Sequence, residues 1–144
     1  MLTIRDLTIN DLDNLINLLH QLWPGKAIHK KAVKTIIIKG INNNHQFYYC
    51  ATLDDKIVGF CSLTLKNNLW TEGTLGNIDE LVVDENYRNK GIGKELLLHI
   101  ERLAQKLNCT RMELDSAFHR SEAHVFYEHI GFEKRAYLFS KSLK

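Results

Sequence analysis

The chain has 144 residues, of which 44% are apolar and 25% charged, and this balance excludes a disordered chain and favours a single domain over residues 1–144. Its net charge of +2 is too small to indicate nucleic acid or an acidic membrane surface as the main partner. The three cysteines are odd in number, and no stretch is apolar enough for a signal peptide or a membrane span, so we expect a cytoplasmic protein.

Two helices are predicted after a short first strand. The strand covers residues 2–7, and Thr8 then offers an N-cap for a helix with apolar residues at helical spacing. A proline–glycine pair at 24–25 ends that helix. A second, lysine-bearing helix is expected over residues 28–38, with Gly40 as its stop.

The middle of the chain alternates between strands and one strong helix. β-Branched and aromatic residues predict strands over 47–53 and 57–65, and the Asp-Asp-Lys between them predicts an antiparallel hairpin. A further strand is expected over 75–83, an amphipathic helix over 94–107 and a strand over 111–117.

The last predicted elements are a helix capped by Ser121 and ended by Gly131, and a strand over residues 135–143. The whole order of elements predicts an α/β fold with a mixed, mostly antiparallel twisted sheet flanked by helices.

The most informative stretch joins the 75–83 strand to the next helix and reads Arg88-Asn89-Lys90-Gly91-Ile92-Gly93-Lys94. Backbone N–H groups at a helix N-terminus have no intrahelical partner and favour an anion, and the glycines allow close approach and unusual dihedral angles. The stretch therefore suits a pyrophosphate. Neither a Walker A loop nor a Rossmann fingerprint fits, since Glu95 and Leu96 stand where those motifs need other residues. The alternative is an ordinary strand–helix connection that happens to hold two glycines.

Two further stretches give this loop a context. Upstream, the apolar strand carries two consecutive carboxylates, Asp79 and Glu80; downstream, residues 123–132 read Ala-His-Val-Phe-Tyr-Glu-His-Ile-Gly-Phe. With an R-x-x-G-x-G loop between them, the chain resembles the GNAT family of N-acetyltransferases along nearly its whole length. The resemblance implies the acyl-CoA N-acyltransferase fold, in which a bulge in the fourth strand splays it from the next strand and opens a slot for the cofactor.

The resemblance also implies that acetyl-CoA is the acyl donor. Backbone groups of the fourth strand would pair with its pantetheine arm, and the loop would bind its pyrophosphate. The implied cofactor-binding residues are Leu81, Val82, Val83, Arg88, Asn89, Lys90, Gly91, Ile92, Gly93, Lys94 and, less directly, Arg120. The last is a departure, because many relatives have asparagine at that position.

Catalysis on an amine needs a base, an oxyanion donor and an acid. Glu80 is the candidate base, acting through a water, and Asp79 is the competitor because neighbouring strand residues face opposite sides. The backbone N–H of Leu81 or Val82 would stabilise the oxyanion. Tyr127, at the family position whose hydroxyl points at the cofactor sulfur, is the candidate acid. The alternative interpretation makes all three side chains structural.

Acceptor specificity is expected from the segment around Trp23 and its lysine-rich continuation, with His119 as a second candidate contact. No histidine, cysteine or carboxylate spacing indicates a metal site. The predicted function is transfer of an acetyl group from acetyl-CoA to a primary amine of a small molecule, in a ternary complex. The alternatives are a protein lysine or N-terminal acetyltransferase and a non-catalytic CoA-binding module. A homodimer is expected from the resemblance.

Overall fold

Five strands and four α-helices make up the computed structural model, which describes all of residues 1–144. The elements are β1 (Leu2–Asp6), a 3₁₀ turn (Ile9–Asp11), α1 (Leu12–Leu22), α2 (Lys30–Ile41), β2 (Gln46–Leu53), β3 (Lys56–Asn68), β4 (Gly73–Val83), a second 3₁₀ turn (Glu85–Tyr87), α3 (Ile92–Lys106), β5 (Cys109–Leu114) and α4 (Ser121–His129). The chain divides into two compact units, Met1–Glu113 and Leu114–Lys144. None of the four α-helices has the length and hydrophobicity of a membrane-spanning segment.

The strands form one sheet in the order β1-β2-β3-β4-β5. The first four strands pair antiparallel with their sequence neighbours, while β5 is reached through the α3 crossover. This arrangement confirms the predicted fold class and the predicted hairpin. The strands of the β3–β4 hairpin are longer than the sequence indicates, because residues 66–68 pair with residues 73–75 beyond the last apolar position.

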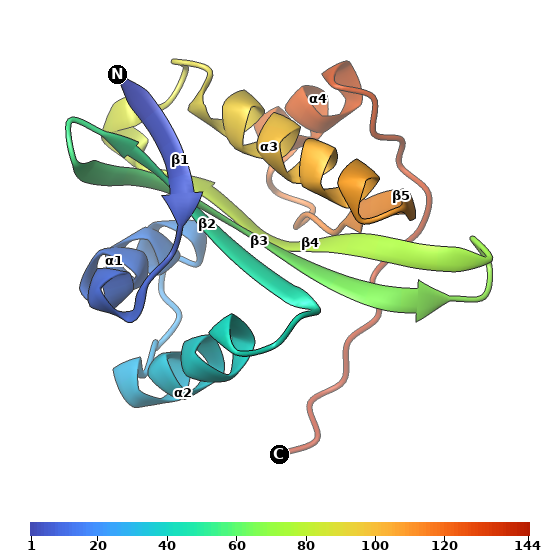
Figure 1. The fold of residues 1–144 in the computed structure, drawn as a ribbon, viewed down its shortest axis with the longest axis horizontal. Coiled ribbons are helices and arrows are strands. Elements are labelled where there is room, and N and C mark those ends of the chain that lie inside the picture. The colour runs from blue at the N-terminus through green and yellow to red at the C-terminus, as the bar shows by residue number, and fades with distance from the viewer. The chain divides into compact units, whose positions relative to one another are not determined.

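Helices cover both faces of this sheet (Figure 1). On one face, leucines of α1 and Ile37 of α2 pack on Cys50, Phe60 and Val82 of the strands. On the other face, α3 buries its apolar stripe, and the ring of its His99 meets Tyr49 at 4.5 Å between centroids. Burial of both sheet faces explains why β3 is apolar along most of its length.

Helix α2 contains the glycine that was expected to end it. The helix runs from Lys30 to Ile41, and Gly40 is buried within its last turn. A Cβ at Gly40 would lie 2.1 Å from the hydroxyl oxygen of Tyr48 on β2. The glycine therefore serves close packing against the Tyr48 ring, a requirement that local sequence does not reveal.

Two predictions for the C-terminal unit are wrong. No strand forms over residues 135–143, where the chain has neither helix nor strand and exposes Tyr137 and Phe139. A strand exists only where its backbone groups find a partner strand, and β-type composition alone does not supply one. Ser121 is the first residue of α4 rather than its cap. The predicted stop is confirmed, because Gly131 has φ +104° just past the helix end.

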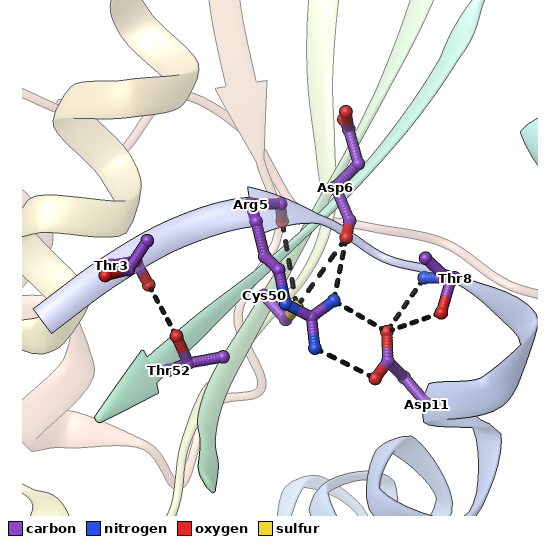
Figure 2. A network of polar contacts seen from close by, with 7 residues as sticks. All are labelled: Thr3, Arg5, Asp6, Thr8, Asp11, Cys50 and Thr52. Carbon is purple, nitrogen blue, oxygen red and sulfur yellow. Dashed lines mark hydrogen bonds and ion pairs between the residues drawn. The ribbon is translucent and has the colours of Figure 1, made fainter. Parts of the chain in front are cut away.

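The start of α1 is fixed by a polar network at the end of β1 (Figure 2). The Arg5 guanidinium donates to both carboxylate oxygens of Asp11, at 2.8 and 3.0 Å, and the Thr8 N–H donates to the same carboxylate at 2.8 Å. The hydrogen bonds from Arg5 lower the pKa of Asp11 to about 2, against the opposing effect of burial. Asp11 thus ties the strand to the helix through one buried charge.

We predict that Asp11→Asn lowers the free energy of unfolding at pH 7 by about 1.5–3 kcal/mol, the range for hydrogen bonds to charged groups. The Asp11 pKa is lower in the folded protein, about 2 against 3.8, so its stabilisation is present above about pH 4 and is lost as the pH falls towards 2. Urea unfolding at several pH values measures this difference. Asp13→Asn is the matched control, because its carboxylate pairs with Lys30 on the exposed surface. Equal losses in the two variants would contradict the prediction.

Candidate active site

Strand β4 has the bulge that the family resemblance implied, and it lies at Asp79. In the pairing with β3, Glu80 lies opposite Ser62 while Ile78 lies opposite Leu63, so the register shifts by one residue between them. Asp79 is the extra residue on β4 and has no partner in the ladder. The splaying of β4 from β5 stays a prediction.

The bulge places Asp79 and Glu80 on the same face of the sheet. The Glu80 carboxylate accepts a hydrogen bond from the Ser62 hydroxyl at 2.7 Å, and the Asp79 carboxylate accepts one from the Thr64 hydroxyl. Because Ser62 and Thr64 are two residues apart on β3, their side chains face the same side. The expectation that the two acids face opposite sides is therefore wrong at this point. The amide of Asn77 also donates to Asp79, at 2.7 Å.

A row of polar side chains crosses three strands at this level. Tyr48 of β2 lies opposite Ser62, which lies opposite Glu80. Burial raises the pKa of the Tyr48 phenol, and the charges of Glu80 and Asp79 raise it further, so the phenol is neutral at physiological pH. Sequence reasoning missed both hydroxyl residues. Once the register of the hairpins is known, their polar side chains in line with Glu80 would have identified them.

The cysteines take no part in this row. Cys61 is buried on β3, and burial, followed by the charges of Glu80 and Asp79, raises the pKa of its thiol well above the usual range. Burial likewise raises the pKa of Cys50 to about 11. Neither thiol is a thiolate at neutral pH, so neither is an activated nucleophile.

Backbone groups of β4 alternate in direction beyond the bulge. The N–H of Glu80 donates to the Ser62 hydroxyl at 3.0 Å, and the N–H of Asp84 donates to the Val58 carbonyl at 2.8 Å, so both point towards β3. The N–H groups of Leu81 and Val83 therefore point away from β3. The Arg88 Nε donates to the Val83 carbonyl on this outer edge at 3.2 Å.

The loop after β4 leads into α3 through one left-handed glycine. Gly91 is the N-cap of the helix with φ +80°, and the helix begins at Ile92, two residues earlier than predicted. The first intrahelical donor is the Glu95 N–H, which bonds the Gly91 carbonyl. The N–H groups of the first turn thus lie at the positive end of the helix dipole.

Only one of the two glycines has the expected conformation. Gly93 lies inside the first turn of α3 and is not among the positive-φ residues, whereas Asn89 has φ +62°. The side chain of Ile92 is buried and anchors the turn to the core, so only its backbone is available to a ligand.

Positive charge surrounds the loop. Arg88, Lys90 and Lys94 are exposed, and Lys56 and Lys90 lie over the Tyr87 ring at 5.2 and 5.4 Å from its centroid. Lys56 is the first residue of β3, far from the loop in the chain, so sequence reasoning did not predict its presence here. The residues present therefore fit an anionic ligand such as a pyrophosphate.

The remaining predicted site residues lie elsewhere. Trp23 is half-buried at the end of α1 and packs against the apolar cluster under the sheet. Arg120 is the N-cap of α4, His119 is exposed, and the Tyr127 ring lies 5.5 and 5.9 Å from the rings of Phe126 and Phe132. Arg120, His119 and Tyr127 belong to the second unit, Leu114–Lys144, and their roles stay predictions.

Comparison with known proteins extends this picture. Aminoalkylphosphonate N-acetyltransferase of Salmonella typhimurium is 27% identical over 140 residues, which cover 97% of this chain and 90% of the relative. Glucosamine 6-phosphate N-acetyltransferase of Trypanosoma brucei brucei is 32% identical over 85 residues, covering 58% of this chain and 56% of the relative. The solved structure of an aminoglycoside N-acetyltransferase in complex with CoA has the same fold, with a TM-score of 0.87, 19% identity and coverage of 100% of this chain and 96% of that one.

A family model confirms the resemblance inferred from the loop and its flanking motifs. The model of the Acetyltransferase (GNAT) family matches residues 12–132, from the start of α1 to the end of the Gly-Phe motif. The chain therefore belongs to the GNAT family and is an acetyl-CoA-dependent N-acetyltransferase.

Proposed function

We propose that this enzyme transfers the acetyl group of acetyl-CoA directly to a primary amine of a small molecule, with both substrates bound at once. The observation that carries the proposal is the position of Glu80. Its carboxylate lies at the bulge of β4, on the strand whose outer edge continues through the Arg88 loop to the N-terminus of α3. A base and an anion-binding turn are thus carried by one continuous segment.

The loop and the outer edge of β4 are the proposed acetyl-CoA site. The first-turn N–H groups after Gly91, with Arg88 and Lys90, would hold the pyrophosphate, and the backbone of Leu81 and Val83 would pair with the pantetheine arm. Acetyl-CoA supplies an activated acetyl thioester. Of the two candidate oxyanion donors, Leu81 is favoured over Val82, because its N–H points away from β3.

Glu80 is the proposed base. An acceptor amine with a pKa near that of lysine, about 10.4, is protonated at neutral pH and must lose a proton before it attacks. The Glu80 carboxylate, held by Ser62, would accept that proton through a water. Asp79 is the second candidate, since it faces the same side and is held by Thr64 and Asn77.

Tyr127 is the proposed acid, which would donate its phenolic proton to the departing thiolate. This role rests on the family resemblance of the Ala-x-x-Phe-Tyr motif. A small-molecule acceptor is supported by the names of the relatives, two of which describe an amine that also carries a phosphonate or phosphate. The cytoplasmic location and the homodimer belong to the same proposal; buried free thiols support the first, and the family resemblance supports the second.

A turnover screen tests the function. Release of CoA thiol from acetyl-CoA is measured with aminoalkylphosphonates, glucosamine 6-phosphate, aminoglycosides, polyamines and lysine peptides as acceptors. We expect turnover with a small-molecule amine and a sequential kinetic pattern. Turnover with peptides alone would assign a protein acetyltransferase, and a double-reciprocal pattern of parallel lines would exclude the ternary complex.

We predict that Glu80→Gln lowers kcat/KM for the preferred amine by about 10²–10⁴-fold, the usual contribution of a general base. The amide keeps the shape of the side chain but cannot accept the proton. Glu101→Gln, at an exposed position of α3, is the control and should leave kcat/KM unchanged. If Asp79→Asn has the larger effect, the base is Asp79 instead.

We predict that Tyr127→Phe lowers kcat by about one to two orders of magnitude, which reaches the lower end of the usual 10²–10⁴-fold contribution of a proton-transfer group. The ring and its packing are kept and only the hydroxyl is lost. Steady-state rates at saturating acetyl-CoA measure this effect. An unchanged kcat would remove Tyr127 from the mechanism.

We predict that Gly91→Ala weakens CoA binding at least severalfold, because a residue with a side chain disfavours the left-handed conformation of the N-cap by about 1–2 kcal/mol and the turn shifts. Gly25 is a matched control: its φ is +81° against +80° for Gly91, and a Cβ meets nothing within 4 Å at either position. Both alanine variants should lose similar stability, but calorimetric titration should find weaker CoA binding only for Gly91→Ala. Equal CoA affinities in the two variants would contradict the proposed pyrophosphate site.

A further inference from the structure

Ser62 is a buried polar residue in the middle of the apolar strand β3. The residue is 1% exposed, and the positions on either side of it, Cys61 and Leu63, are buried apolar residues. A buried hydroxyl is costly unless it is hydrogen-bonded. Both partners of the Ser62 hydroxyl come from Glu80, the residue directly opposite on β4.

The two hydrogen bonds fix the direction of the hydroxyl proton. The Ser62 Oγ accepts the N–H of Glu80 at 3.0 Å and donates its own proton to Glu80 Oε1 at 2.7 Å. Backbone and side chain of the same residue are thereby bound to one oxygen. The contact lies at the bulge, where Glu80 is the residue opposite Ser62.

Two titratable groups face Glu80 from the surrounding strands. Asp79 comes from β4 and the phenol of Tyr48 from β2, whereas the thiol of Cys61, the neighbour of Ser62 on β3, points to the opposite face of the sheet. A second carboxylate on the same face disfavours the ionised form of Glu80, whereas a hydroxyl that donates to the carboxylate favours it. Ser62 therefore acts against the repulsion from Asp79.

We propose that Ser62 is a positioning residue that keeps the Glu80 carboxylate ionised and aimed, so that it serves as the base. The inference rests on the proposed function of Glu80. Ser62 itself touches neither substrate in this scheme and acts through Glu80 alone.

The test compares Ser62→Ala with Ser62→Thr by carbon NMR of glutamate labelled at the side-chain carboxyl, in the protein without substrates. The Glu80 signal is assigned by its loss in Glu80→Gln. We expect Ser62→Ala to raise the pKa of Glu80 by about one unit, the size of a lost hydrogen bond to the charged form, and Ser62→Thr to restore it. An unchanged pKa of Glu80 in folded Ser62→Ala would overturn the proposal.

Activity provides the second readout. In Ser62→Ala the acidic limb of the kcat/KM profile should shift to higher pH by the same amount, whereas a merely structural loss would lower the rate at every pH. Thr64→Val removes the hydroxyl that donates to Asp79 and is the matched control. A shift of the acidic limb in Thr64→Val but not in Ser62→Ala would assign the base to Asp79 and overturn the proposal.

The two readouts separate this proposal from the proposed function. If no amine is acetylated by the wild-type enzyme, the proposed function fails, while the NMR titration still decides whether Ser62 sets the ionisation of Glu80. If Ser62→Ala does not fold, Ser62→Cys takes its place, because the thiol keeps the volume and is a weaker donor. A Glu80 pKa in Ser62→Cys equal to that of wild type would then overturn the proposal.

Discussion

The register of β4 against β3 is the constraint on which the site depends. The extra residue Asp79 shifts the pairing by one residue, so that Glu80 lies opposite Ser62. The backbone N–H groups of Glu80 and Asp84 then point towards β3. The same alternation directs the backbone of Leu81 and Val83 to the outer edge. A single bulge thus sets both the proposed base and the strand edge proposed to bind the cofactor.

The bulge brings two carboxylates to one face of the sheet, and hydrogen bonds from β3 offset their repulsion. Two consecutive carboxylates on one face repel each other, and a regular strand would have separated them. Hydroxyl groups of β3 donate to both acids, with Asn77 as a second donor to Asp79. Ser62 and Thr64 are the polar residues within the apolar stretch 57–65 of β3, and they supply these hydroxyl groups.

Sequence reasoning succeeded where the determining contacts are local. Periodicity placed most helices and strands within a few residues, and the family resemblance implied the bulge in β4. It failed where the conformation of a segment depends on a residue that is distant in the chain. Gly40 of α2 is required by close packing against the Tyr48 ring on β2, and the two carboxylates are oriented by hydroxyl groups of β3. Residues 135–143 form no strand because no partner strand pairs with them.

The register of β4 also determines where the loop that follows it begins. Arg88 bonds the Val83 carbonyl, and the Asp84 N–H bonds the Val58 carbonyl, so the chain leaves β4 in a fixed direction. The left-handed Gly91 then starts α3, whose buried Ile92 anchors the turn in the core. The first-turn N–H groups are therefore held on a rigid helix that packs on the same strands as Glu80. A shift of one residue in the register of β4 would displace both the Glu80 carboxylate and the turn that starts α3, which is the physical reason to propose them as parts of one site.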